Sequence, residues 1–402
     1  MRIQRVIPPA AAPIPARCLL EGFLALFHGK RVLEKREGEL RQYFGVKHVF
    51  LLSSGKAALT VILRALKQHC PDRDEVLIPA YTCFSVPSAI VKAGLKVALC
   101  DIDPATFDFD DRLLERAIND RMLCVVPDHL FGIPANMDRI TALCKAKGVL
   151  VVEDASQAMG GRYRNHWLGT LGDVGFFSLG RGKNLTCGSG GIIITNSDSI
   201  AAKIREEYEC LEYPSLIEIF REFLEVMLLM LFMRPSLYWF PAGLPFLRLG
   251  ETIFYRDFPI KRLSGMQASL LKDWQPRLER ANEWRRQIST ELKKTLHINL
   301  LRECIPYLRF PVLVESHAIR DTLFFKKKPL GLSCMYPVPV NEIKEIGYMF
   351  VGKFYPCAKD VSERILTIPT HQFISIKDRR MLHQAFSVNW KAVLGSEIVV
   401  LK

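Results

Sequence analysis

The chain is 402 residues long and 49% hydrophobic, which is enough for a large core and for two or three domains. Its formal charge of +13 favours anionic partners, such as nucleotide diphosphates, phosphate or an anionic membrane face. A nucleic-acid-binding module is not indicated, because the sequence has no zinc-ligand spacing, no recognition-helix pattern and no aromatic–basic platform.

The 11 cysteines are scattered along the chain and never form a Cys-x-x-Cys pair. Many of them lie in apolar segments, as buried free thiols do. This usage fits a reducing cytoplasm and indicates no metal site.

Residues 1–15 are rich in proline and predict an extended arm rather than the apolar core of a signal peptide. The arm and a following helix are expected to fill residues 1–42. A large domain is then predicted over 43–257, and a smaller C-terminal α+β domain over 258–402.

From about Tyr43 the pattern alternates between apolar strands and helices. This alternation predicts an α/β fold, with a mostly parallel sheet covered by helices on both faces. The expected strands are His48–Leu52, Glu75–Ile78, Lys96–Cys100, Met122–Val126 and Val149–Val152, and the expected helices are Gly55–Leu66, Val86–Lys92, Asp110–Ile118 and Met137–Lys147.

Polar side chains follow the last of these strands. Four apolar residues in a row, Val149–Val152, indicate a buried parallel strand. Ligands of open α/β sheets bind beyond the carboxyl ends of the strands, so Glu153, Asp154 and Gln157 lie where chemistry is expected. Taken alone, Asp154 would be better explained as the cap of a following helix.

Lys183 lies in a glycine-rich turn between two further apolar strands, Val174–Leu179 and Ile192–Thr195. Glycine lets the backbone approach a ligand closely. A lysine at such a strand end is a candidate imine-forming amine. An aspartate and a lysine at the ends of two nearby strands can serve pyridoxal phosphate. The carboxylate keeps the ring nitrogen protonated, and the lysine forms an imine with the aldehyde.

An apolar segment lies between Tyr208 and Asp257 and is most hydrophobic over 216–247. Its uncharged run, Val226–Met233, is 8 residues long and far shorter than the roughly 20 residues that a spanning helix needs. Two explanations stay open. The segment is either a helical hairpin packed on the domain or at a dimer contact, or an anchor lying in the plane of a membrane. After it, Gln267–Leu296 is expected to be helical.

Together these segments resemble the DegT/DnrJ/EryC1/StrS family of sugar aminotransferases, which have the fold of type I pyridoxal-phosphate transferases. Single pieces of the match are common, but their joint order and spacing are specific. The matching segments are Tyr43–Gly55, Ala57–Leu59, Asp74–Thr82, Ala93–Pro104, His129–Gly132, Glu153–Gln157, Gly169–Asp173, Phe177–Ser178, Lys183–Asn184, Arg285–Arg286, Tyr336–Pro337, Tyr355–Pro356 and Leu366–Pro369.

The resemblance implies a role for each matching polar residue. Lys183 would bind pyridoxal phosphate covalently and move the proton during transfer. Asp154 would pair with the ring nitrogen, and Gln157 would lie near the phenolic oxygen. Ser178 would contact the phosphate, as would Gly55 and its neighbours, because they begin a helix whose free N–H groups favour an anion.

Several positions depart from the family pattern. Lys56 replaces a threonine and would either contact the phosphate or point to solvent. Cys83 aligns with the usual aromatic ring over the cofactor, although a one-residue shift would place Phe84 there. Ile260 replaces the asparagine through which the partner subunit contacts the phosphate. The family keeps a histidine at His129, either as a substrate contact or as a residue bonded to backbone at a strand end.

The family resemblance also implies a reaction. Relatives that remove a sugar hydroxyl carry histidine where this chain has Lys183, so transamination is expected, with glutamate as donor and a nucleotide- or lipid-linked keto sugar as acceptor. A homodimer is implied as well. Two alternatives stay open: another pyridoxal-phosphate reaction, such as dehydration or amination of a non-sugar ketone, and a non-catalytic regulatory relative.

Overall fold

The computed structural model describes residues 4–24, 29–296 and 305–387 of the chain. Its main feature is a seven-stranded sheet in the order β1-β9-β8-β5-β4-β2-β3. The pairs from β8 through β3 are parallel, whereas β9 and β1 run antiparallel to their neighbours. The strands are β1 His48–Leu52, β2 Glu75–Pro79, β3 Lys96–Cys100, β4 Met122–Val125, β5 Leu150–Asp154, β8 Val174–Ser178 and β9 Gly191–Thr195. The predicted mostly parallel sheet is confirmed.

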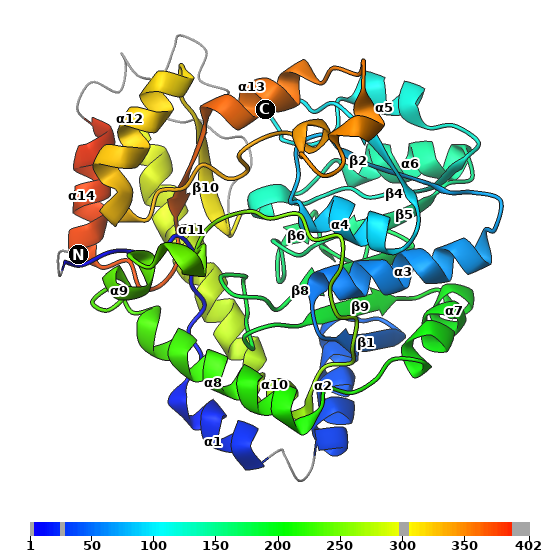
Figure 1. Ribbon diagram of the computed structural model, residues 1–402, viewed down its shortest axis with the longest axis horizontal. Coiled ribbons are helices and arrows are strands. Elements are labelled where there is room, and N and C mark those ends of the chain that lie inside the picture. The colour runs from blue at the N-terminus through cyan, green and yellow to red at the C-terminus, as the bar shows by residue number, and fades with distance from the viewer. Residues whose placement is uncertain (1–3, 25–28, 297–304, 388–402) are drawn as a thin grey trace.

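Helices cover both faces of this sheet (Figure 1). Alternate residues of β1 show how the faces are separated, because neighbouring side chains of a strand point to opposite sides. Phe50 and Leu52 belong to the core that contains α3, whereas Val49 and Leu51 belong to the core under α2. The helices of this part are α1 Ala16–Leu24, α2 Gly29–Phe44, α3 Gly55–His69, α4 Ser85–Lys92, α5 Asp111–Ala117, α6 Met137–Ala146, α7 Asp198–Glu209, α8 Leu216–Phe232, α9 Trp239–Ala242 and α10 Gly265–Ser269.

The C-terminal part forms a second, two-stranded antiparallel sheet of β10 Arg309–Leu313 and β11 Ile365–Pro369. Its helices are α11 Trp274–Leu296, α12 His317–Lys327, α13 Pro356–Arg364 and α14 Ile376–Ser387. In Figure 1, α12 and α14 lie at the upper left, α13 lies at the top, and α11 runs down toward the middle. The division of the chain at residue 257 stays a prediction. A small hairpin, β6 Arg162–Tyr163 with β7 His166–Trp167, and the 3₁₀ turns η1 Leu130–Gly132, η2 Pro245–Leu247, η3 Lys328–Leu330, η4 Val340–Glu342 and η5 Gly347–Phe350 complete the described elements.

The continuous helix expected over Gln267–Leu296 is wrong. The structure has two helices, α10 and α11, which are separated at residues 270–273. Asp273 has a φ of 52°, a left-handed conformation that a right-handed helix cannot contain.

The N-terminal arm runs as an extended segment between the two parts of the molecule (dark blue in Figure 1). Ile7 is buried, and its N–H donates to the carbonyl of Pro329 at 2.8 Å. His371 lies 2.7 Å from the carbonyl of Pro8 through Nε2. Because the backbone N–H of Phe373 points at Nδ1, the proton of the neutral ring lies on Nε2 and is donated to Pro8. The arm is therefore fastened to the C-terminal part.

This attachment makes stability depend on pH. Burial lowers the pKa of His371 from 6.5 to about 4. The unfolded chain takes up the proton below pH 6.5 and the folded chain does not, so stability is lost as the pH falls from 6.5 toward 4. We expect a contribution of about 2 kcal/mol to disappear between pH 7.5 and 5.

The variant His371→Gln keeps a donor for Pro8 and cannot titrate. Urea unfolding at both pH values should show a smaller loss in this variant than in the wild type. The matched control is His317→Gln, because His317 is exposed. Equal losses in wild type and His371→Gln would contradict the assignment.

Candidate active site

The parallel strands β2, β4, β5 and β8 end at one edge of the sheet, and the predicted site residues lie at this edge. Asp154 is the last residue of β5, and Ser178 is the last residue of β8. The carboxyl ends of β4 and β5 are joined further by a bridge between Asp128 and Asp154. Lys183 follows β8 in a turn whose carbonyl at Gly180 accepts from the Lys183 N–H.

Two buried carboxyl groups, Asp128 and Asp154, lie together at this edge. They are 5% and 4% exposed, so neither is solvated. Burial and then the charge of Asp154 raise the pKa of Asp128 to about 7. Burial likewise raises the pKa of Asp154. Lys183 opposes both shifts, because its positive charge lowers the pKa of each carboxyl group. Lys183 is therefore close enough to both carboxyl groups to affect their pKa.

One oxygen of this pair of carboxyl groups lacks a hydrogen-bond partner among the described residues. Asp128 Oδ2 accepts from the hydroxyl of Thr82 at 2.7 Å, whereas Oδ1 is buried without a hydrogen-bond partner among the described residues. Asp154 Oδ1 accepts from the N–H of Ser156 at 2.9 Å. No helix begins here in the described structure, so the alternative role of Asp154 as a helix cap does not apply.

Glu153 and His129 have structural contacts. His129 is fully buried, and its Nε2 lies 2.7 Å from Glu153 Oε1. Nδ1 accepts from the N–H of Ala135 at 3.1 Å. Both ring nitrogens are thus engaged by protein groups. This geometry favours the structural explanation of His129, as a residue that holds the end of β4, over a direct contact with substrate.

The predicted phosphate contacts lie close together. A β-carbon at Gly55, the first residue of α3, would lie 2.9 Å from Cβ and 3.2 Å from Oγ of Ser178. Glycine is required here because α3 begins against the end of β8. The N-terminus of α3 and the hydroxyl of Ser178 therefore lie next to one another, as an anion site at a helix N-terminus needs.

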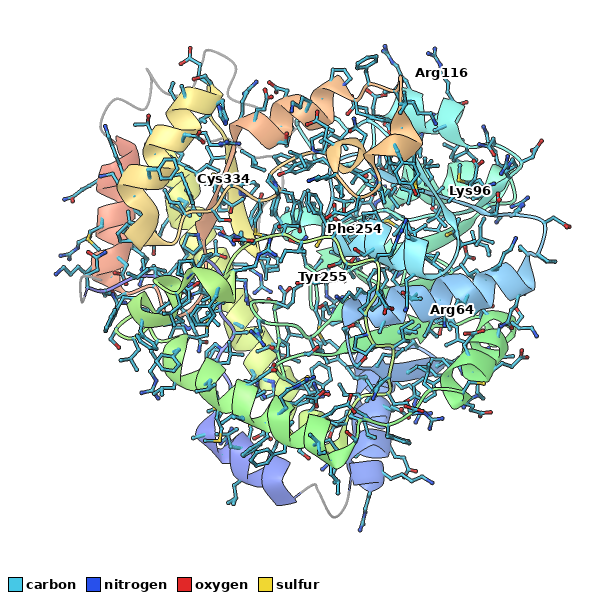
Figure 2. All side chains as sticks on the ribbon, in the orientation of Figure 1. Arg64, Lys96, Arg116, Phe254, Tyr255 and Cys334 are labelled. Atoms are coloured by element: carbon cyan, nitrogen blue, oxygen red, sulfur yellow. The ribbon has the colours of Figure 1, made fainter. Side chains whose placement is uncertain are left out.

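The ammonium group of Lys56 lies against two aromatic rings, and its contact with the phosphate stays a prediction. Its ammonium lies 4.3 Å from the ring centre of Tyr255 and 4.6 Å from that of Phe258. Figure 2 labels Tyr255 near the middle of the view, on the segment that runs past α4. The N–H of Tyr255 donates to Ser88 of α4 at 3.1 Å, which fixes this segment. Desolvation lowers the pKa of Lys56, and the aromatic faces offset part of that cost.

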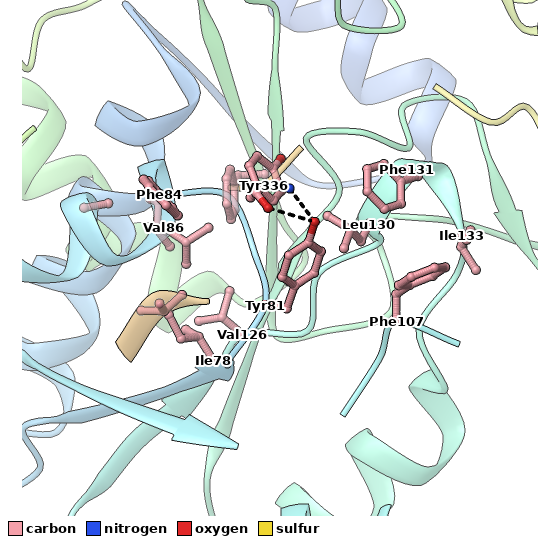
Figure 3. Close-up of a cluster of buried hydrophobic side chains, with 14 of the residues drawn as sticks. Ile78, Tyr81, Phe84, Val86, Phe107, Val126, Leu130, Phe131, Ile133 and Tyr336 are labelled. Carbon is pink, nitrogen blue, oxygen red and sulfur yellow. Dashed lines mark hydrogen bonds between the residues drawn. The ribbon is translucent and has the colours of Figure 1, made fainter. Parts of the chain in front are cut away.

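Gln157 and Tyr336 form the wall next to these groups. Gln157 Nε2 donates to the hydroxyl of Tyr336 at 3.1 Å, and its Oε1 accepts from the N–H of Phe131 at 3.2 Å. Figure 3 shows Tyr336 above Tyr81, whose hydroxyl bonds to the Tyr336 backbone. Phe84 lies in the same cluster, with its ring 6.3 Å from that of Tyr336.

Cys83 is half-buried. Its thiol influences the pKa of Lys56 and that of Tyr336, which shows that it lies close to both side chains. Phe84 is 5% exposed and packs into the core with Tyr336. This packing supports Cys83 as the residue that faces a ligand. Ile260 packs at the edge of the main core.

A comparison with known proteins identifies the family. The model described as the DegT/DnrJ/EryC1/StrS aminotransferase family matches residues 18–226. The chain belongs to this family.

Individual relatives match part of the chain. GDP-perosamine synthase from Caulobacter vibrioides is 37% identical over 175 residues, covering 44% of this chain and 47% of that protein. A pleiotropic regulatory protein from Geobacillus stearothermophilus is 37% identical over 174 residues, covering 43% and 46%. The chain thus spans about half the length of these curated relatives in the match.

Solved structures of sugar aminotransferases have the same fold along nearly the whole chain. Helicobacter pylori PseC, an aminotransferase involved in the biosynthesis of pseudoaminic acid, has a TM-score of 0.75 and 17% identity, covering 97% of this chain and 100% of that chain. The sugar aminotransferase CalS13 from Micromonospora echinospora has a TM-score of 0.76 and 20% identity, covering 96% and 100%.

The sequence analysis did not select Asp128 as a site residue, although Asp128 follows an apolar strand just as Asp154 does. It follows the apolar run of β4 as Asp154 ends β5, with Pro127 between the run and the carboxyl group. The sequence could not show that Tyr336 contacts Gln157 in the site, because Tyr336 belongs to a segment far along the chain.

We expect Asp128→Asn to stabilise the cofactor-free protein at pH 8. The raised pKa of Asp128 means that its ionisation costs stability as the pH rises from 3.8 toward about 7, and the amide removes this cost. The midpoint of thermal unfolding at pH 8 should rise by about 2–4 °C. Asp120→Asn, at an exposed position, is the control. A lower midpoint in Asp128→Asn would contradict the like-charge pair.

Proposed function

We propose that this protein is a pyridoxal-phosphate-dependent aminotransferase. It would transfer an amino group from glutamate to the ketone of a nucleotide- or lipid-linked sugar, for amino-sugar or surface-polysaccharide biosynthesis. The observation that carries the proposal is the approach of Lys183 to the buried carboxyl groups of Asp154 and Asp128, at the carboxyl edge of the sheet. Membership in an aminotransferase family supports it.

The residues present fit the cofactor at both ends. Two buried carboxyl groups next to one another disfavour ionisation of both unless a cation lies against them. A protonated ring nitrogen would supply that cation and would give the buried Asp128 Oδ1 a partner. At the other end, the N-terminus of α3 and Ser178 would hold the phosphate dianion. When bound, pyridoxal phosphate supplies an electron sink for the α-carbon of the amino acid.

The residues around the cofactor would each have a separate role. Asp154 would keep the ring nitrogen protonated, because a carboxylate in a buried site strongly favours a neighbouring cation. Lys183 would hold the cofactor covalently and, once released, move a proton at the substrate α-carbon. Gln157 and Tyr336 would orient the oxygen side of the ring through their hydrogen bond.

The alternatives differ in what they require of Lys183. A dehydrating relative is disfavoured because such relatives carry histidine there. One matched relative is named as a pleiotropic regulatory protein, so a regulatory role is the second candidate. A protein with that role alone would not need a lysine beside a buried aspartate pair, and this chain keeps both.

Covalent attachment of the cofactor tests the proposal. Purified protein treated with pyridoxal phosphate and then borohydride should carry one pyridoxyl group on Lys183, located by peptide mass spectrometry. The variant Lys183→Ala should lose the label and lose at least about 10³-fold in transamination rate, because no other base takes over the proton transfer. Lys203→Ala, which changes a partly exposed lysine paired with Glu206, is the control.

The substrate is tested separately from the cofactor. A panel of nucleotide-linked keto sugars, incubated with glutamate and cofactor, should yield one product whose mass shows the exchange of a ketone for an amine. Labelling of Lys183 without any such product would favour amination of a non-sugar ketone. Absence of labelling would favour the regulatory alternative.

We further propose a cytoplasmic homodimer that touches the inner face of a membrane. No helix among the described residues is long and apolar enough to span a bilayer. However, α8 carries a row of exposed apolar side chains, and the segment after α9 continues it. These residues, here called the apolar face, are Leu216, Ile217, Phe220, Leu224, Met227, Leu228, Leu231, Phe240, Phe246, Leu247 and Leu249. The lower left of Figure 1 shows α8 and α9 at the edge of the molecule.

An exposed face made of this many apolar side chains is typical of an interaction site rather than of free surface. The net charge of +13 favours an anionic bilayer as the surface that it meets. The protein should co-sediment with phosphatidylglycerol vesicles, and Ile217→Glu with Phe220→Glu should reduce the bound fraction at least about fivefold. Phe354→Glu is the control, since Phe354 is 87% exposed and lies outside the apolar face.

Sedimentation of the same variants without lipid shows whether the apolar face contacts a membrane or a second copy of the chain. A variant that becomes monomeric, while the wild type never binds vesicles, would assign the apolar face to the dimer contact instead.

A further inference from the structure

A cavity lies where three segments that are far apart in the chain meet. Its volume is about 440 Å³, within the range of roughly 300–1,000 Å³ that is usual for small-molecule sites. Its walls come from the N-terminal arm at Ile7, from α9 and the segment around it at Tyr238 and Leu249, and from residues 331–335. Figure 2 labels Cys334, one of these residues. We call this space the arm cavity.

Backbone hydrogen bonds hold the walls of the arm cavity in place. The N–H of Val6 in the arm donates to the carbonyl of Pro235, just before α9, at 3.0 Å. Ser333 exchanges two backbone hydrogen bonds with Thr367 of β11, at 3.2 and 2.8 Å. The folded chain therefore forms the cavity by itself, as most small-molecule sites are formed.

The lining of the arm cavity is nearly uncharged. Glu251 is the one charged residue among the described lining residues, and its carboxylate already accepts from Arg248 at 2.6 Å. A diphosphate or carboxylate ligand needs cations or several N–H donors, and a carboxylate on the rim opposes it. The lining therefore favours an apolar ligand and disfavours a nucleotide diphosphate.

The arm cavity opens onto the apolar face. Ala242 and Leu249 line the cavity and are exposed, whereas Ile7 and Leu332 line it and are buried. Leu249 also belongs to the apolar face, and Phe240 of that face lies two residues before Ala242. The apolar surface on α8 and α9 is therefore continuous with the inside of the cavity.

Another wall of the arm cavity adjoins the candidate active site. Met335 and Pro337 line the cavity and flank Tyr336 in the sequence. The hydroxyl of Tyr336 accepts from Gln157 at 3.1 Å. One short segment thus separates the cavity from the residues proposed to hold the cofactor.

The size of the arm cavity suits a single hydrocarbon chain. A methylene group takes about as much room as a water molecule, about 30 Å³, so the cavity has space for roughly 10–15 carbon atoms. An α-helix with its side chains is about 10–12 Å across, so a helix of a partner protein is too wide to enter.

We propose that the arm cavity binds the hydrocarbon chain of a lipid-linked sugar, and that this lipid-linked form is the acceptor for the amino group. The chain would enter from the apolar face, and the sugar would lie on the Tyr336 side. Each buried methylene group strengthens binding roughly fourfold, so a short length of chain selects a lipid-linked acceptor over a nucleotide-linked one. This inference rests on the proposed aminotransferase function.

The test measures binding of the chain without turnover. Wild-type protein loaded with pyridoxal phosphate is titrated with farnesyl phosphate, which carries one prenyl chain, and with methyl phosphate, which has the same head group and no chain. Calorimetry is done below the concentration at which farnesyl phosphate forms micelles. We expect farnesyl phosphate to bind at least about 100-fold more tightly than methyl phosphate.

Two variants block the arm cavity from different segments. Ala242→Trp places a large ring at the exposed rim, and Thr252→Trp does the same from the half-buried segment after Gly250. Each should bind farnesyl phosphate at least about tenfold more weakly than wild type and methyl phosphate equally well. Ala242→Ser, which changes the same position without filling the space, is the matched control. The second blocking variant keeps the test decisive if the first does not fold.

The chain of an acceptor is distinguished from an acyl chain of the surrounding bilayer. Ala242→Trp should co-sediment with phosphatidylglycerol vesicles as wild type does, because the residues of the apolar face are unchanged. If this variant loses vesicle binding and keeps its affinity for farnesyl phosphate, the cavity takes bulk lipid and its role for the acceptor is overturned.

The remaining outcomes also decide the proposal. Weaker binding of farnesyl phosphate by the blocking variants, with Ala242→Ser equal to wild type, supports it. Equal affinity in all proteins, or no effect of the chain in wild type, overturns the cavity as its site. Borohydride labelling of Lys183 separates these results from failure of the proposed function. Chain binding by an unlabelled wild type would remove only the link to amination, whereas labelling without chain binding would overturn the cavity alone.

Discussion

The candidate site depends on one buried carboxylate that the proposed chemistry does not use. Glu153 is fully buried in β5, and its two oxygens accept from the N–H groups of Gly169, Leu171 and Gly172 and contact the ring of His129. These bonds tie β5 to the turn before β8 and to the end of β4. Because neighbouring side chains of a strand point to opposite faces, Asp154 is directed away from this network and toward Lys183. Rigid backbone on one side of the strand thus positions the acid on the other side.

The charges around Lys183 are distributed unevenly. Two buried carboxyl groups, Asp128 and Asp154, lie near Lys183, and Arg285 donates to the carbonyl of the same lysine. Two neighbouring buried carboxyl groups cost free energy in the chain alone, and a cationic group of a ligand placed against them would relieve that cost. The protonated ring nitrogen of the proposed cofactor would meet this requirement.

Much of the sheet and part of the site could be predicted from the sequence. β1 and β3 begin and end at the predicted residues, because their apolar runs are bounded by turn signals. Asp154 and Lys183 were selected because each follows an apolar strand, and strand ends in an α/β sheet share one edge, whereas Ser178 was implied by the family resemblance. Their roles stay predictions. Residues whose position depends on side chains far away in the sequence could not be placed from the sequence alone. The position of Lys56 depends on Tyr255 and Phe258, and that of Tyr336 depends on Tyr81 and Gln157, far back in the chain.

The central claim is that the carboxyl group of Asp154 lies against the ring nitrogen of a cofactor held by Lys183. The most direct measurement is the ¹⁵N NMR shift of ring-labelled pyridoxal phosphate bound to the protein, in wild type and in Asp154→Asn. The account predicts a protonated ring nitrogen in the wild type and loss of that proton in the variant. An unprotonated ring nitrogen in the wild type, or the same shift in both proteins, would contradict it.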